Sequence, residues 1–127
     1  MQLTHWFDIV RIMKTSDVIK TLTALAQESR LATFRLLVQN GQQGLRAGKI
    51  TELLSIMPTT LSFHLKELSN ASLVNSRQEG RFVIYMANFK RMNELLEFLT
   101  ANCCTGNSCM SAMECVATGT EKPTKTA

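Results

Sequence analysis

The cysteines are the most chemically distinctive residues of this sequence, because all four lie between Cys103 and Cys115. Thiolate sulfur suits soft metals and metalloids, and it also supports redox chemistry. Cys103 and Cys104 are adjacent, so on a regular helix their side chains point about 100° apart and cannot hold one atom together. We therefore expect a helix to end at this pair, with Gly106 as a candidate C-cap. The chain beyond it would let Cys109 fold back as the third ligand, and Cys115 could replace or assist it.

Other interpretations of this cysteine cluster stay open at this point. Four thiolates could hold zinc in a closed tetrahedral site, although the usual CxxC spacing is missing from the sequence. A thiol with a lowered pKa would make a redox switch, and thiols without any ligand role are the simplest alternative. No cysteine is paired with a histidine and an orienting carboxylate in a pattern that indicates nucleophilic catalysis. We therefore do not expect an enzyme.

Positive charge is concentrated between Arg46 and Arg91. This stretch contains seven basic and three acidic side chains, so it carries the whole net charge of +4. From Cys103 onward the charges balance. The separation predicts one surface for a polyanion and a second region for another ligand. No apolar run has the length to span a bilayer or to act as a secretory signal, so we expect a cytoplasmic protein with reduced thiols and no membrane partner.

Apolar periodicity and turn residues divide the chain into three parts. Residues 1–14 are expected to form an N-terminal extension, in which Met13 is a possible second start of translation. Residues 15–102 are expected to form one domain, and residues 103–127 a flexible cysteine-bearing tail. Helices are expected over about 17–26, 28–39, 50–56, 59–70 and 89–101. A loop over 41–48 separates the second helix from the third, and a turn at Gly80 between two β-rich runs predicts a hairpin. This order predicts a mainly α fold with a β-hairpin wing (α+β), a winged helix-turn-helix.

Local signals set the details of the two central helices. The side chains expected to face inward from the helix over 50–56 are Ile50, Leu53 and Leu54. The next helix is expected to be capped by Thr59 or Thr60. Its inward face comprises Leu61, Leu65 and Leu68.

The outward face of the helix over 59–70 suits DNA. Short hydroxyls at its first turn fit phosphate oxygens and base edges, Phe63 fits a thymine methyl group, and Lys66 fits a phosphate. Arg77 and Arg81 flank the hairpin tip, where a minor groove or the flanking backbone would lie. A solvated helix and an ordinary charged hairpin are the alternative, but the turn, the hairpin and the local charge all favour DNA. The candidate DNA-binding residues are Thr59, Thr60, Ser62, Phe63, His64, Lys66, Arg77 and Arg81.

His64 has two interpretations. It lies at the edge of the inward face, three residues after Leu61 and four before Leu68. It is therefore either a DNA contact or a partly buried structural histidine.

Three segments together resemble the ArsR/SmtB family of bacterial metal-sensing repressors. They read LAQESRL at 25–31, TLSFHLKEL at 60–68 and GRFVIY at 80–85, and the resemblance covers about residues 15–104. It implies a homodimer built from the first and last helices, with paired recognition helices on an imperfect DNA palindrome. Half-sites are then expected about one helical turn (34–36 Å) apart. It also implies that metal binding releases the protein from DNA.

The resemblance also bears on the inducer. Some family members use cysteines in the helix expected over 50–56, where this sequence has none, and others use histidine and carboxylates across the last helix. Here Glu94 and Glu97 are present there, but no histidine lies beyond His64. Adjacent cysteines after the last helix resemble the arsenite-responsive members. The resemblance thus implies a repressor with trivalent arsenic as inducer, bound by Cys103, Cys104 and Cys109, and with no permanent cofactor.

Related possibilities remain. Antimony, bismuth or methylated arsenicals would fit a similar thiol site. A redox-responsive or zinc- or cadmium-responsive repressor of the same fold is the main alternative. A thiol metalloid carrier is a remoter one, because it leaves the recognition helix and wing without a role.

Overall fold

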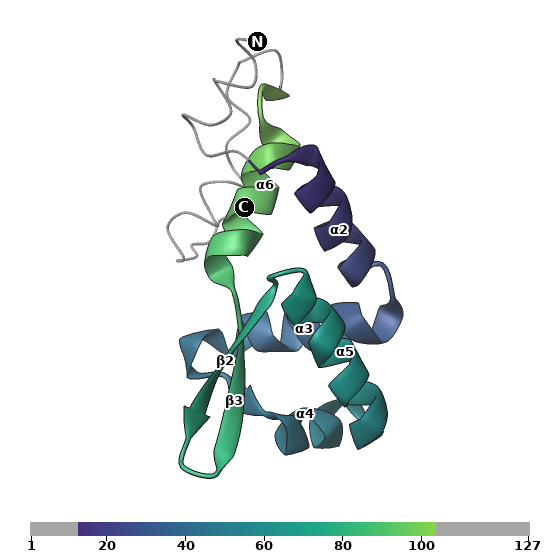
Figure 1. Cartoon of the computed structure of the whole chain (residues 1–127), viewed down its shortest axis with the longest axis vertical. Coiled ribbons are helices and arrows are strands. Elements are labelled where there is room, and N and C mark those ends of the chain that lie inside the picture. The colour runs from purple at the N-terminus through teal and green to yellow at the C-terminus, as the bar shows by residue number, and fades with distance from the viewer. Residues whose placement is uncertain (1–12, 104–127) are drawn as a thin grey trace, which may run out of the picture.

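The computed structural model describes residues 13–103, so most of the expected extension over residues 1–14 and the chain from Cys104 onward lie outside the described residues. The expected mainly helical fold with a β-hairpin wing is confirmed (Figure 1). The elements are α2 (Thr15–Leu25), α3 (Glu28–Gln39), the 3-10 turn η1 (Gly41–Gln43), β1 (Leu45–Arg46), α4 (Ala47–Leu54), α5 (Pro58–Asn70), β2 (Val74–Glu79), β3 (Phe82–Ala87) and α6 (Phe89–Thr100). The proposed domain boundaries stay predictions.

The main core lies where α3, α4 and α5 meet the base of the hairpin. Its largest completely buried apolar side chains come from α3, α4, α5 and the residue just before β2, and they are Leu37, Ile50, Leu61, Leu68 and Leu73. Burying each such side chain contributes about 1.5–3 kcal/mol. This core fixes the orientation of α5 relative to the sheet, and so it fixes which face of α5 points outward.

A second, smaller cluster joins the two ends of the described chain. Met13 and Val18 from the start of the chain pack with Leu95 of α6, and Leu25 and Phe98 flank them. Figure 1 shows α2 and α6 together at the upper end of the molecule, with α4, α5 and the hairpin below them. The helices α2 and α6 therefore pack together at one end of the molecule, and α2 also contacts α5.

The sheet has three antiparallel strands in the order β1-β3-β2. The sequence predicted a loop over 41–48, but η1 and β1 lie there, and Leu45 pairs with Tyr85. Gly44 permits this pairing. Its φ is +72°, and a Cβ atom there would lie 2.5 Å from the carbonyl oxygen of Tyr85, which any side chain would have to displace.

Both central helices begin earlier than expected. Pro58, not a threonine, opens α5, and the N-cap is Met57 without a side-chain hydrogen bond, so the predicted caps Thr59 and Thr60 lie inside the first turn. The first position of a helix favours proline, because the fixed φ of proline matches a helix and proline has no N–H group that would be left unpaired.

The helix α4 begins at Ala47 instead of near Ile50. Ile50 is fully buried, but Leu53 is 51% exposed, so its expected inward position is wrong. Leu54, four residues after Ile50, turns closer to the buried side and is half-buried. A helix this short packs only a narrow strip of its surface.

Truncating one buried and one exposed leucine to alanine tests where α4 and α5 place these side chains. Leu68→Ala should lower the free energy of unfolding by about 2–5 kcal/mol, because it leaves a cavity in the core. Leu53→Ala should lower it by about 1 kcal/mol or less, since this side chain is half exposed. Urea denaturation at equal protein concentration measures both, and equal losses would contradict the described α4.

Candidate nucleic-acid interface

The helices α4 and α5 form a helix-turn-helix. Three residues connect them, and the first of these, Ser55, has a left-handed backbone with φ of 55°. The inner face of α5 is buried as expected, with Leu61 at 1%, Leu65 at 3% and Leu68 at 0% exposure. The turn and the buried face together present the opposite side of α5 to solvent.

Most of the predicted recognition residues share that outer side of α5. Positions three and four apart on a helix lie on one face. Phe63 is 55% exposed, which is unusual for a large aromatic side chain. The exposed members of the predicted set on α5 are Thr59, Thr60, Ser62, Phe63 and Lys66.

His64 does not belong to this outer face, which corrects its inclusion among the candidate DNA contacts. Its side chain is only 6% exposed, and its ring lies 5.9 Å from that of Phe63. The Nδ1 atom has no hydrogen-bond partner in the described part of the chain. Burial, with a smaller contribution from the positive charge of Arg30, lowers the pKa of His64 below its ordinary value of 6.5. The geometry favours the structural interpretation.

Arg77 lies in the wing but is occupied by internal contacts. Its Nη1 and Nη2 atoms each donate to a carbonyl of η1 at 3.0 Å, those of Gln42 and Gln43. Its Nε atom donates to the carboxylate of Glu79 at 2.7 Å. This guanidinium ties the hairpin to the turn after α3, and its predicted DNA contact stays a prediction.

Arg81 lies within the hairpin tip, which the sequence predicted it to flank. Glu79 pairs with Phe82, so Gly80 and Arg81 form a two-residue loop. Gly80 comes first in that loop with φ of +61°, which favours glycine in such tight hairpins. The Arg81 side chain is exposed.

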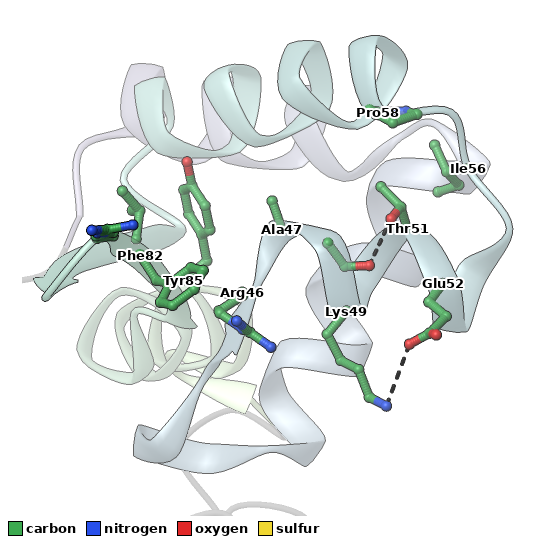
Figure 2. A pocket seen from close by; sticks show the side chains of 12 residues that line it. Arg46, Ala47, Lys49, Thr51, Glu52, Ile56, Pro58, Phe82 and Tyr85 are labelled. Carbon is green, nitrogen blue, oxygen red and sulfur yellow. Dashed lines mark hydrogen bonds and ion pairs between the residues drawn. The ribbon is translucent and has the colours of Figure 1, made fainter.

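Sequence reasoning missed a group of residues between the wing and α4. A hollow of about 870 Å³ lies there, and its cationic lining residues are Arg46, Lys49 and Arg81. In Figure 2, Phe82 and Tyr85 of β3 border it on one side, and Lys49 and Glu52 of α4 border it on the other. The concentrated basic charge was the available signal. Because the sequence predicted a loop over 41–48, it could not indicate that Arg46 lies beside the wing.

Cys103 is half-buried just beyond the last helix. The helix α6 ends at Thr100, short of the cysteine pair, and Asn102 has the left-handed φ of 59°. Gly106, which was expected to cap the helix, lies outside the described residues. So do Cys104, Cys109 and Cys115, and the ligand set therefore stays a prediction.

The described residues show neither a metal-ligand cluster nor a membrane-spanning helix. Within residues 13–103, no group of three histidine, cysteine or acidic side chains is placed to hold a metal ion. None of the helices over the same range is long and apolar enough to cross a membrane.

The buried histidine makes stability depend on pH. Because the pKa of His64 is lower when folded than its ordinary value of 6.5, the unfolded chain takes up the proton first as pH falls. The contribution of neutral His64 to the free energy of unfolding is therefore complete at pH values above its ordinary pKa and is lost as the pH falls below it. His64→Leu should remove this part of the loss between about pH 8 and pH 5, and at pH 8 it should be neutral or stabilising by about 1 kcal/mol. Parallel urea midpoints for both proteins across this range would contradict the assignment.

The Arg77 contacts predict a difference between the two wing arginines. Arg77→Gln should lower the free energy of unfolding by roughly 1–2 kcal/mol, because the exposed hydrogen bonds of the guanidinium to η1 and to Glu79 are lost. Arg81→Gln is the matched control and should change it by about 0.5 kcal/mol or less. Urea denaturation compares them, and faster amide exchange in η1 should accompany only the Arg77 change.

Comparison with known proteins supports a regulatory role. No family model matches the sequence. The chain is 33% identical over 78 residues to the HTH-type transcriptional regulator YceK of Bacillus subtilis, covering 60% of this chain and 77% of that protein. It is 29% identical over 93 residues to the transcriptional activator HlyU of Vibrio cholerae, covering 73% and 83%.

Solved structures agree with these relatives. An ArsR-like transcriptional regulator from Rhodococcus has a TM-score of 0.63 at 22% identity, covering 80% of this chain and 93% of its own, which shows the fold alone. HlyU from Vibrio cholerae has a TM-score of 0.57 at 29% identity, covering 72% and 99%.

A third structure is the homodimeric winged helix-turn-helix DNA-binding domain of Mb0332 from Mycobacterium bovis, a possible ArsR-family regulator. Its TM-score is 0.55 at 25% identity, covering 72% of this chain and 85% of its own. The α4–α5 pair, the wing and these relatives lead to one conclusion: the chain belongs to the ArsR-like family of winged-helix transcriptional regulators.

Proposed function

We propose that this chain is a repressor that binds operator DNA as a homodimer and leaves it when trivalent arsenic binds thiolates after α6. The observation that carries the arsenic part is the cysteine cluster, which begins at Cys103 just beyond the end of α6. HlyU is named as an activator. Repression is therefore part of the proposal.

The geometry of α5 and the wing supports the DNA-binding part of the proposal. In a helix-turn-helix the second helix enters the major groove and its N-terminal residues meet base edges. The first turn of α5 has no side-chain cap, so its N–H groups and exposed threonines are available to phosphates or bases. Arg81 at the hairpin tip is placed to meet the flanking backbone or minor groove.

A dimer through α2 and α6 accounts for apolar side chains that the described chain leaves uncovered. Ile19 and Leu22 of α2 are 57% and 38% exposed, and Leu99 of α6 is 55% exposed. The two helices also share the small cluster around Val18 and Leu95. Exposed large apolar residues on neighbouring helices favour a protein partner. The homodimeric state of Mb0332 makes a second copy of this chain the proposed partner.

The thiol site would couple to this interface through α6. Trivalent arsenic is soft and pyramidal, so three thiolates on one side suit it. The proposed ligands are Cys103, Cys104 and Cys109, with Cys115 as substitute. Binding ties the segment after α6 to the helix end and changes the angle between protomers. A coupling of about 1–3 kcal/mol corresponds to a 5- to 150-fold loss of DNA affinity.

The experiment measures release from DNA. A duplex is selected from a random library with the wild-type protein, and fluorescence anisotropy follows release on adding arsenite. Cys103→Ser and Cys104→Ser should bind the duplex with wild-type affinity and should not be released, because each change removes a thiolate. Size-exclusion chromatography controls for the dimer. Release of both variants by arsenite would refute this mechanism.

Further variants and added compounds in the same assay identify the inducer and the third ligand. Cys109→Ser should also block release, whereas Cys115→Ser should leave it intact. Methylarsenite needs only two thiols and should still release Cys109→Ser. Antimonite, cadmium and zinc are added in parallel, and release by zinc alone would favour the zinc-responsive alternative.

A redox-responsive regulator is the second candidate. HlyU, 29% identical to this chain, has also been solved in a form described as reduced. Peroxide would oxidise two cysteine thiols to a disulfide and yield two molecules of water. Release by peroxide that dithiothreitol reverses, without release by arsenite, would favour this function over arsenic sensing.

A further inference from the structure

We propose that the hollow between α4 and the wing is a backbone-phosphate contact for duplex DNA, in which Phe82 holds Arg46 in place. The inference rests on the DNA-binding function proposed above. It assigns a second contact that is separate from the outer face of α5. Sequence-independent affinity would come from this hollow, and base discrimination would come from α5.

The charge of the hollow favours an anion. Arg46, Lys49 and Arg81 line it, against the single carboxylate of Glu52. Pro58, the first residue of α5, also lines it. The hollow is therefore continuous with the recognition helix at one end and with the wing tip at the other. The first helix of a helix-turn-helix crosses the DNA backbone, which places a phosphate strand along this path.

Phe82 and Arg46 form the most specific contact in the hollow. The Arg46 guanidinium carbon lies 4.4 Å from the centre of the Phe82 ring. Phe82 is 52% exposed, so core packing does not explain a phenylalanine there. The described chain gives the Arg46 side chain no hydrogen bond or ion pair beyond this ring contact. A cation–π contact orients a guanidinium without using its N–H donors, and these donors remain for phosphate oxygens.

Gly48 leaves one side of the hollow open. It is the second residue of α4 and lines the hollow beside Lys49. Its φ is not positive, and a Cβ atom there would meet nothing within 4 Å. The hollow is therefore open at this point to an anion that approaches Lys49.

Glu52 gives the proposal a test in the opposite direction. Its carboxylate lies 3.4 Å from the Lys49 ammonium, and both side chains are largely exposed, at 71% and 52%. A bound phosphate would compete with the Glu52 carboxylate for Lys49 and would be repelled by that carboxylate. Removing this carboxylate charge should therefore strengthen binding.

The experiment uses the full chain, the selected duplex and a scrambled duplex of the same length and composition. Anisotropy gives both affinities over a salt series. Arg46→Gln and Lys49→Gln should each weaken binding to both duplexes by the same factor, roughly 5- to 10-fold near 0.1 M salt, and should lower the slope of log affinity against log salt by about one. Glu52→Gln should strengthen binding to both.

Two pairs of variants isolate the aromatic contact. Phe82→Leu should weaken binding to both duplexes less than Arg46→Gln does, and Phe82→Tyr, which keeps the ring face, should bind like wild type. Arg46→Lys keeps the charge without the planar fork and should retain only part of the affinity. Circular dichroism and urea midpoints confirm that each variant folds.

Matched controls separate the hollow from general charge and from base reading. Lys14→Gln changes the residue just before α2, and α2 lies at the opposite end of the molecule from the wing tip (Figure 1), so it should leave both affinities unchanged. Phe63→Ala should reduce the ratio between the selected and the scrambled duplex.

Unchanged salt slopes for both Arg46→Gln and Lys49→Gln would overturn this inference while DNA binding by α5 stands. A change confined to the selected duplex would also overturn it, because it would indicate base contacts. Failure of the wild-type chain to bind either duplex overturns the proposed function as well.

Discussion

The buried strip of α5 is the constraint on which the interface depends. Leu61, Leu65 and Leu68 must leave water together, and the helix period allows this only if the residues between them face out. Packing of that strip on α3 and α4 fixes the rotation of α5, and the outward set follows without further choice. His64 lies next to the same strip and is buried with it, which is why a polar residue was lost from the predicted interface.

The sheet fixes the remaining geometry. With β1 paired to β3, Arg46 at the end of β1 lies opposite Ile84 and close to Phe82. The next residue, Ala47, already begins α4. One short strand thus brings the wing and the first helix of the helix-turn-helix to the same hollow. The Arg77 hydrogen bonds to η1 hold the other side of the hairpin.

Much of this fold could be predicted from sequence, because long amphipathic helices and a glycine turn leave periodic signals. The helix over 28–39 and the hairpin at Gly80 agree with the structure. β1 could not be predicted, since two residues carry no alternation and the strand exists only through its pairing with β3. The internal bonds of Arg77 depend on η1, which is distant in sequence. The tail cysteines were evident from sequence alone, because their chemistry needs no fold to be recognised.

The direct passage from β1 into α4 has a mechanical consequence. No linker separates the wing sheet from the recognition unit, and Gly44 packs against the backbone of Tyr85. We therefore expect the wing and the helix-turn-helix to move as one body. In the proposed dimer, a signal that arrives through α6 would move this body whole, and each DNA half-site would be read with a fixed internal layout. Tolerance to operator architecture would then depend on the distance between half-sites, which the proposed packing of α2 and α6 would set.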